Sequence, residues 1–522
     1  MENQGTCQAR YELLAQDREV YLKRARECSK LTLPTLIPEG NAGKYTNFPT
    51  PYQGVGARGV NNLASKLLLS LFPPNSPFFS MKVDDFTVEE IAQEKGARAK
   101  VDKALGKYER SVMQSIEDSG DRSAHFETLK HLIVAGNVLL YLPKEGGTRV
   151  FPLNRYVVVR DPMGSMLEVI IEEDMAFLSL PEDLKALVAE NEGDEGEVNP
   201  KAEIKLHTKF YLEKTKIKSY QEVNGVRVPG SEGSWPKEKS PILALRWTRI
   251  DGEDYGRSYV EEYLGDLISL EGLSKALLEG SAAAARLVFL VRPNGVTKAG
   301  DVMNAANGAA VSGQRDDVQT LQVDKQADMS VAQNQITTIT ERLSFAFLMN
   351  SAVQRNGDRV TAEEVRYMAG ELEDALGGVY SILSQEYQLP YVMRVIDRLT
   401  RSRKLPALPK GVAKPTIVTG LEALGRGHDL SKYDLFLKAL APLGPEVLQS
   451  EMNIGDYITR IGTALGIDLD GLMKSDEQRE QEAAQQQQQM QEAQTMDMVK
   501  GAVPAIAKEG AAAIAQASQS QG

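Results

Sequence analysis

The sequence predicts a mainly helical α+β fold, and three observations carry that prediction. Stretches with the apolar spacing of helices occupy much of the chain. Short strand-like runs cluster between about residues 138 and 247, where turn sequences such as "EGG" and "DPMG" separate them. Two long helical patterns then follow, with a Gly/Asn-rich stretch between them. Strands that follow one another so closely favour antiparallel sheets.

Composition allows a large folded core. At about 150 residues per domain, 522 residues predict some three structural units. The 42% hydrophobic and 25% charged residues are ordinary for a soluble protein. No apolar run approaches the roughly 20 residues of a membrane span. The N-terminal residues "MENQGTCQARYELL" are too polar for a signal peptide.

Charge and cysteine content narrow the function classes. A net charge of −12 argues against tight, sequence-independent binding of duplex DNA, which needs many unopposed cations, but leaves room for a few local contacts. Cys7 and Cys28 flank or lie within one predicted helix. That helix would separate them by about 30 Å, too far for a disulfide. We therefore expect a reducing compartment.

The first 250 residues read as mixed helix and strand. Helical periodicity occupies four stretches, 9–33, 61–72, 97–117 and 124–135. A short helix is expected near 182–190. The predicted strands are "VLLYLP", "RYVVVRD", "MLEVIIEED", "AEIKLHTKFYLE", "KIKSYQEVNGVRV" and "PILALRW". The pair Asn224-Gly225 suits a tight hairpin turn.

The middle of the chain predicts helix, irregular module, helix, turn and helix. The first long helix runs through "DYGRSYVEEYLGDLISLEGLSKALLEGSAAAARLVFLV", about 45 Å for some 30 helical residues. Its apolar face is formed by Tyr259, Tyr263, Leu267 and Leu270. The second spans about 328–350, and its apolar face is formed by Ile336, Ile339, Leu343 and Phe347.

After the turn "QRNGDR", a further helix begins at a capping box made by Thr361 and Glu364, and bends at Gly377-Gly378. A more variable helical region extends from Pro390 to about 474. The Gln/Ala-rich tail has too little apolar surface for a core, which predicts a lone helix or disorder.

The hexapeptide "GVGARG", residues 54–59, matches the G-x-G-x-x-G of a dinucleotide-binding turn. That turn follows a buried strand, whereas "TNFPTPYQ" has two prolines, and no carboxylate stands about 20 residues on. We therefore expect a loop that leads into an amphipathic helix beginning near Asn61 or Asn62.

Motifs for catalysis and metal binding are not recognised. The chain has no phosphate loop, no G-x-S-x-G elbow and no complete EF-hand around "DLDG". Its histidines, His125, His131, His207 and His428, lack the spacing of zinc ligands and are expected to be polar surface residues. We predict no catalytic residue, no metal site and no cofactor.

The turn "QRNGDR" carries Arg355 and Arg359 on either side of Asp358. A solvated turn between helices is the simpler interpretation. Two arginines at a loop tip are also suited to phosphate contacts. One such turn, with a net charge of +1, binds DNA negligibly, whereas a ring of copies pointing inward would not.

Several stretches resemble the portal, or head-to-tail connector, proteins of short-tailed double-stranded-DNA bacteriophages. They are "PYQGVGARGVNNLASKLLLSLFP", "LIVAGNVLLYLP", "DGEDYGRSYVEEYLGDL", "LQVDKQAD", "TGLEALGRGHDL" and, most specifically, "ERLSFAFLMNSAVQRNGDRVTAEEVRYMAGELEDALGGVYSILSQEYQLP". Except for "TGLEALGRGHDL", which lies beyond, they run from about Gln53 to Pro390. In this family the hexapeptide opens a helix and has no nucleotide role.

The resemblance implies a portal fold that assembles as a ring of twelve subunits at one capsid vertex. Arg355, Asn356 and Arg359 become candidate DNA contacts in a tunnel loop. The implied parts are a wing (1–252), a first stem helix (253–291), a clip (292–326), a second stem helix (327–353), the tunnel loop (354–360), a wing return with crown helices (361–474) and a barrel helix or disordered tail (475–522).

The same resemblance implies the partners. Double-stranded DNA passes through the ring during packaging and ejection, the terminase docks during packaging, and a tail adaptor binds the clip. Major capsid, scaffolding and internal core proteins are the other expected partners. The protein is made in the host cytoplasm and ends in the virion, without a membrane and without catalytic activity of its own. Two alternatives stay open, an oligomeric α/β enzyme with a helical assembly arm and a capsid-internal scaffold.

Overall fold

The computed structural model of the protein describes most of the chain up to residue 418. The described ranges are 5–40, 46–74, 77–83, 97–143, 146–177, 203–285, 288–321, 326–349, 375–406 and 413–418, with a few single positions elsewhere. The chain divides into one compact unit of residues 1–93 and 104–428, and a second of 94–103 and 429–522. Apart from residues 97–103, the fold and site described below belong to the first unit.

Four helices predicted in the first third of the chain are present. They are α1 (Cys7–Leu31), α2 (Val55–Leu71), α4 (Ala97–Asp118) and α5 (Arg122–Ala135). Helix α1 begins at Thr6, whose hydroxyl accepts a hydrogen bond from the Ala9 amide at 3.2 Å. Cys7 and Cys28 both lie in α1, buried and free, as the spacing predicted.

The start of α2 corrects the sequence-based expectation. The helix begins at Val55, with Gly54 as its N-cap, rather than near Asn61 or Asn62. The hexapeptide "GVGARG" is therefore the cap and first turn of a helix, and not a loop before one. The physical reason is close packing at two of its glycines, described with the site below.

The predicted antiparallel sheet is confirmed. Its order is β4-β5-β6-β7-β8, with β9 pairing on β7. Cys7, Tyr11 and Leu14 of α1 pack against Val157 and Ile170 of this sheet. The strands are β4 (Tyr156–Arg160), β5 (Met166–Ala176), β6 (Glu203–Glu213), β7 (Lys216–Val223), β8 (Val226–Arg227) and β9 (Gly233–Pro236).

The hairpin between β7 and β8 forms as its sequence predicts. Asn224 and Gly225 have φ angles of 47° and 80°. A two-residue turn of this handedness needs positive φ at both positions, which Asn and Gly tolerate best.

Two smaller sheets complete the mixed region. The first has the order β10-β2-β3, formed by β10 (Ile242–Arg246), β2 (Asn137–Tyr141) and β3 (Arg149–Pro152). The second pairs β1 (Phe79–Val83) with β13 (Ala413–Ile417), antiparallel. The sequence did not predict this pair, and β13 lies in a region expected to be helical throughout. Short 3-10 turns occur at η1 (Leu153–Arg155) and η3 (Lys237–Lys239).

The middle of the chain contains the two long helices, with two corrections to the first. The first is interrupted near Tyr263 into α7 (Tyr259–Glu262) and α8 (Leu264–Ala284), and it does not continue to residue 291. The residues "VFLV" form β11 (Val288–Val291), which pairs with β12 (Val318–Leu321). β-Branched and aromatic side chains favour a strand there.

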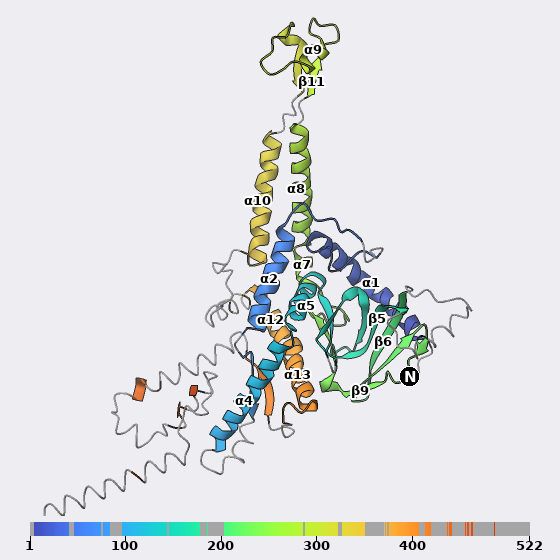
Figure 1. Ribbon diagram of the computed structural model, residues 1–522, viewed down its shortest axis with the longest axis vertical. Coiled ribbons are helices and arrows are strands. Elements are labelled where there is room, and N and C mark those ends of the chain that lie inside the picture. The colour runs from blue at the N-terminus through green and yellow to red at the C-terminus, as the bar shows by residue number, and fades with distance from the viewer. Residues whose placement is uncertain are drawn as a thin grey trace, which may run out of the picture. The chain divides into compact units, whose positions relative to one another are not determined.

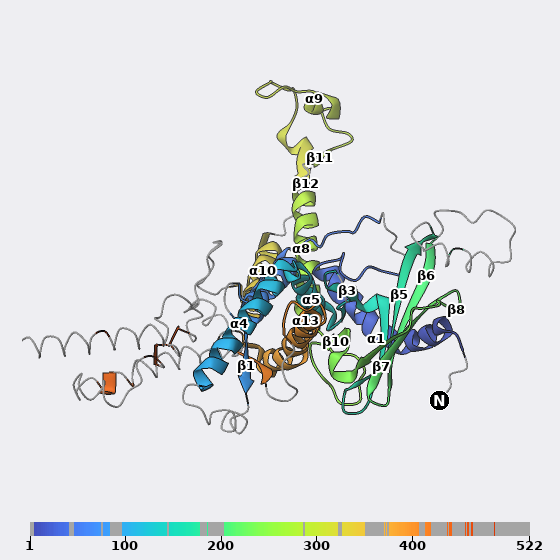
Figure 2. The ribbon, with the colours of Figure 1, turned by 60° about the horizontal axis from the view of Figure 1, so that its bottom comes forward.

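Between α8 and the second long helix, α10 (Gln326–Ala346), the chain forms a small module with α9 (Ala299–Met303) and η4 (Arg315–Asp317). Figures 1 and 2 show α8 and α10 as the two long helices that lead into and out of this module.

The chain returns through α12 (Gly378–Leu383), a π-helical turn η5 (Ser384–Gln388) and α13 (Leu389–Arg401). Gly377, with φ 53° and ψ −128°, interrupts the helix before α12, so the predicted bend at Gly377-Gly378 is confirmed.

Other predictions fall outside the described residues: the short helix near 182–190 apart from Lys185, which is helical, the capping box of Thr361 and Glu364, "DLDG", and nearly all of the tail. Within the described part of the chain, no helix is both long and apolar enough to cross a bilayer.

Candidate functional site

The predicted DNA-contacting residues, Arg355, Asn356 and Arg359, lie outside the described residues, as does the rest of 350–369. The structure describes the chain on both sides of this segment, up to Met349 and again continuously from residue 375. We therefore build the site from the two long helices and from the contacts that hold these two ends.

Helices α8 and α10 pair along one apolar seam. Leu267 and Leu270 of α8 and Ile339 and Leu343 of α10 are buried, as their spacing predicted. An ion pair joins Arg342 to Asp266 at 2.6 Å. The helices also carry large apolar side chains that the subunit leaves exposed, namely Ile268, Leu278, Val331 and Phe345.

The end of α10 has the geometry of a Schellman motif. The Met349 amide donates to the Ser344 carbonyl at 2.8 Å, and the Leu348 amide donates to Phe345 at 3.0 Å. Leu348 occupies the left-handed position with φ 53°. Glycine is usual there, and a residue with a Cβ costs roughly 1–2 kcal/mol. Such strain persists where the surroundings fix the backbone.

Side chains from two other helices bind the last carbonyls of α10. The Tyr259 hydroxyl donates to the Ala346 carbonyl at 2.8 Å. The Asn62 amide donates to the carbonyls of Phe347 at 2.9 Å and Leu348 at 3.0 Å. The Lys66 ammonium, 7% exposed, reaches the Leu348 carbonyl at 2.9 Å. A cation is favourable at a helix C-terminus, where the carbonyl dipoles leave negative charge.

The glycines of "GVGARG" explain how α2 comes so close. A Cβ on Gly59 would lie 2.7 Å from Cγ of Phe347, and one on Gly56 would lie 2.5 Å from the Leu31 carbonyl oxygen. Both positions therefore require glycine for close helix packing. The hexapeptide that resembles a phosphate-binding turn instead lets α2 pack against the ends of α1 and α10.

The chain after the undescribed segment returns to the other end of the same helix. The hydroxyls of Ser70 and Tyr380 lie 2.7 Å apart. The side-chain amide of Gln388, fully buried, donates to the Leu71 carbonyl. Helix α2 therefore contacts both the end of α10 and the start of the return (Figure 1).

A buried aromatic cluster fixes this lower end of α2. The His125 ring stacks on Phe72 with centroids 4.2 Å apart, and its Nδ1 lies 2.5 Å from the Tyr387 hydroxyl. Tyr391 donates to Asp121 at 2.9 Å. Burial lowers the pKa of His125 to about 4, so the ring is neutral at neutral pH.

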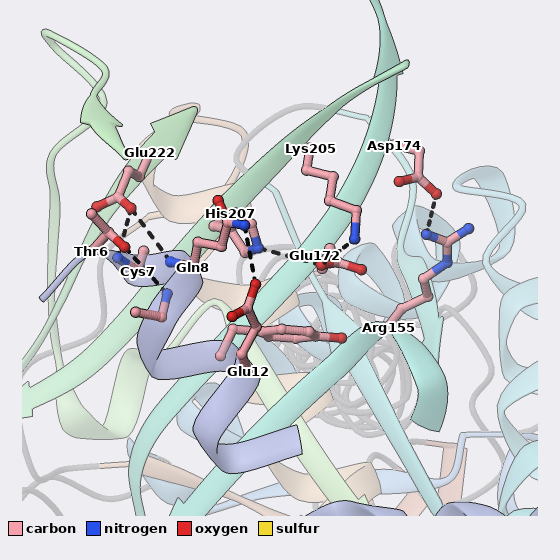
Figure 3. Close-up of polar contacts among 12 residues, drawn as sticks. Thr6, Cys7, Gln8, Glu12, Arg155, Glu172, Asp174, Lys205, His207 and Glu222 are labelled. Atoms are coloured by element: carbon pink, nitrogen blue, oxygen red, sulfur yellow. Dashed lines mark hydrogen bonds and ion pairs between the residues drawn. The ribbon is translucent and has the colours of Figure 1, made fainter. Parts of the chain in front are cut away.

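Three of the four histidines correct the expectation of surface positions. His125, His131 and His207 are 1%, 3% and 1% exposed. Figure 3 shows His207 on β6 facing Glu172 on β5, with 3.4 Å between Nε2 and the carboxylate. Burial by itself would raise the pKa of Glu172, but the neighbouring His207 ring and Lys205 ammonium outweigh it and lower the pKa. His428 lies outside the described residues.

The other contacts in Figure 3 join α1 to the sheet or join two strands of the sheet to each other. Glu222 accepts the Cys7 amide at 2.6 Å, and Lys205 pairs with Glu172 at 3.2 Å. Among the side chains that the structure describes, no group of three or more His, Cys, Asp or Glu is arranged to hold a metal ion.

The module between the long helices has a polar interior. Of its side chains described between 289 and 319, only Thr297 and Asp317 are buried. Asp317 accepts hydrogen bonds from the Thr297 amide at 3.1 Å and its hydroxyl at 3.3 Å. Large apolar side chains are exposed around them, namely Phe289, Leu290, Val296 and Met303.

Comparison with known proteins settles the family. The model of the bacteriophage head to tail connecting protein family matches residues 4–473. The portal protein of Escherichia phage T7 is 44% identical over 515 residues, which cover 97% of this chain and 94% of that protein. The chain belongs to the bacteriophage head to tail connecting protein family.

Two further portal proteins of this family align over nearly the same length. That of Enterobacteria phage T3 is 44% identical over 478 residues, 91% of this chain and 89% of that protein. That of Enterobacteria phage SP6 is 33% identical over 505 residues, 96% of each. A solved neck of an empty gene transfer agent particle aligns with 80% of this chain and 90% of that chain, at 13% identity and a TM-score of 0.34.

Membership in the head to tail connecting family confirms the resemblance read from the sequence. The protein is a portal-type connector, a component of the virion at the junction of head and tail, and joins capsid to tail. Its relatives are structural connectors.

Sequence reasoning missed the residues that hold the ends of the 350–369 segment, Asn62, Lys66 and Ser70. The signal was present in "GVGARGVNNLASK", where an amphipathic helix carries two glycines and a lysine on its apolar side. A lysine at an apolar helical position indicates a buried partner.

Proposed function

We propose that twelve copies of this chain form a ring at one capsid vertex, with a central channel through which the double-stranded DNA genome enters during packaging and leaves during ejection. The observation that carries this proposal is the family match over residues 4–473, together with 44% identity along almost the whole length of a portal protein.

The parts of the ring follow the chain. Residues 1–252 form the wing, the helices of 253–291 and 327–353 form the stem, and residues 361–474 form the wing return and crown. The strand β11 indicates that the clip, proposed at 292–326, begins as early as Val288. Residues 475–522 form a barrel helix or a disordered tail.

The charge of the stem supports a channel in which DNA slides. Helices α8 and α10 carry five carboxylates and two cations along their sequences. Strong phosphate contacts would hold the duplex in place, so an acidic wall lets it pass in both directions. In this proposal a ring of loops, with Arg355, Asn356 and Arg359 touching phosphates, retains the packaged DNA.

The partners follow from this position. The terminase docks during packaging and supplies the ATP hydrolysis, so the connector itself carries no catalytic activity. A tail adaptor binds the clip, whose exposed Phe289, Leu290 and Met303 offer apolar contacts. Major capsid, scaffolding and internal core proteins contact the ring inside or around the head.

The experiment compares particles assembled with Arg355→Ala and Arg359→Ala against particles with lysine at both positions. Lysine keeps the charge and therefore part of the phosphate contact. We expect both variants to form rings, the alanine pair to lose packaged DNA, and the lysine pair to retain more of it. Normal DNA content and infectivity with the alanine pair would contradict the role given to the loop.

A further inference from the structure

Helix α2 contacts the chain on both sides of residues 350–369. Asn62 and Lys66 of α2 bind the carbonyls of Phe347 and Leu348 on one side of the segment. Ser70, one turn further along α2, lies 2.7 Å from the Tyr380 hydroxyl on the other side. Lys66 and Ser70 are separated by about 6 Å along the helix axis.

We propose that α2 is a positioning element for residues 350–369, and that Asn62, Lys66 and Ser70 are positioning residues that set where both ends of this segment stand relative to the stem. This inference rests on the proposed function, because it gives the segment's position a role in holding DNA. None of the three side chains needs to touch DNA for this role.

The choice of side chains argues for positioning. Lys66 is 93% buried in a helix whose neighbours Leu63, Leu67 and Leu71 are fully buried. Burying an ammonium costs free energy that an apolar side chain of similar size would not. The gain is positional, because the hydrogen bond from the ammonium to the Leu348 carbonyl forms only when that carbonyl is correctly placed, whereas an apolar side chain would only fill space.

Backbone conformation at the two ends gives an independent observation. Leu348 and Gly377 both have φ 53°, on either side of the segment, and Leu348 holds it despite its Cβ. Leu348 is left-handed, whereas Gly377, with ψ −128°, has a conformation that is essentially restricted to glycine. Both residues redirect the chain sharply. The contacts of α2 lie directly beside these positions, where holding the backbone has most effect.

The test uses full-length rings and particles with the double variant Asn62→Ala and Lys66→Met. Asn61→Ala is the matched control, because Asn61 precedes Asn62 on the same helix and is exposed. Two readouts are made on each protein: amide hydrogen exchange of residues 340–349 in assembled rings, and the fraction of particles that retain DNA.

We expect the double variant to form rings, to exchange faster at the end of α10, and to lose DNA that the Asn61→Ala particles retain. Restoring lysine at position 66 in the double variant should recover part of the retention. Unchanged exchange would show that the contacts do not hold the end of α10. Faster exchange with the same retention as Asn61→Ala would show that α2 only stabilises the fold. Either result overturns the proposal.

If the double variant does not assemble, Asn62→Ala alone decides with the same two readouts, because that side chain binds the carbonyls of both Phe347 and Leu348. Failure of the proposed function is distinguishable. It appears with the unsubstituted protein, as absent rings or as unchanged retention when Arg355 and Arg359 are replaced, whereas failure of this inference appears only in the α2 variants.

Discussion

Replacing Gly56 by alanine tests whether the glycines of "GVGARG" serve packing or ligand binding. The new Cβ would lie 2.5 Å from the Leu31 carbonyl oxygen and 3.1 Å from Cγ2 of Thr32. A backbone oxygen at the end of α1 cannot swing aside as a side chain can. The substitution therefore forces two helices apart.

The net effect follows from two opposing terms. Overpacking a close contact costs about 1–3 kcal/mol. Alanine in place of glycine inside a helix stabilises the folded protein by about 1 kcal/mol. Because the obstructing atom is backbone, we place the cost near the top of its range and expect a net loss of about 2 kcal/mol.

The control is Gly272→Ala in α8, where no atom lies within 4 Å of the added Cβ. This variant gains only the higher helix propensity of alanine, so we expect its free energy of unfolding to rise by about 1 kcal/mol. Urea unfolding at one protein concentration, followed by the fluorescence of Trp235 and Trp247, measures both variants. A Gly56→Ala protein as stable as the control would refute the packing argument, and a ligand-binding turn would predict that result.

Two other substitutions test buried polar groups. The pKa of His125 is about 4 in the folded protein and 6.5 in the unfolded chain, because burial favours the neutral ring. The free energy of unfolding is therefore highest above pH 6.5. It falls as the pH drops towards 4, by about 3 kcal/mol in total. His125→Asn should flatten this slope in urea titrations at a series of pH values; an unchanged slope would contradict the assignment. In the module between α8 and α10, Asp317→Ala leaves the Thr297 amide without its acceptor. We expect faster proteolysis within 292–317 than in Asp316→Ala, whose side chain is exposed. Equal cleavage rates would show that Asp317 does not hold the module together.

Local chemistry made much of the fold predictable. The strands of the large sheet have either alternating apolar residues or short continuous apolar runs. Between two such strands, the pair Asn224-Gly225 favours a two-residue hairpin turn. The seam between α8 and α10 follows from a spacing of three and four residues, and the burial of Leu267 and Leu343 agrees with it. Each of these signals is complete within a few neighbouring residues.

The errors arise where a distant partner decides. Glycine by itself destabilises a helix. Nothing in the sequence near Gly59 indicates that close packing against the ring of Phe347 offsets this cost. The residues "VFLV" extend a helical pattern, and only their pairing with Val318–Leu321 makes them a strand. The sequence around His125 indicates a polar surface residue. Only the folded chain brings Phe72 and the tyrosines that follow Gly377 against its ring and buries it.

The site itself was only partly predictable. Arg355 and Arg359 could be named from a turn sequence and a family resemblance, and their role stays a prediction. The contacts of Asn62 and Lys66 could not be predicted, because both side chains bind backbone carbonyls, which carry no sequence signal. A backbone acceptor can lie next to any residue type, so only the folded structure identifies it.

The central claim is that this chain forms a closed ring. The most direct test is light scattering combined with negative-stain microscopy, on the purified protein and on the connector released from assembled heads. The account predicts annular particles with a central hole and a mass near twelve times 57.3 kDa. Monomers or open assemblies from both sources would contradict it.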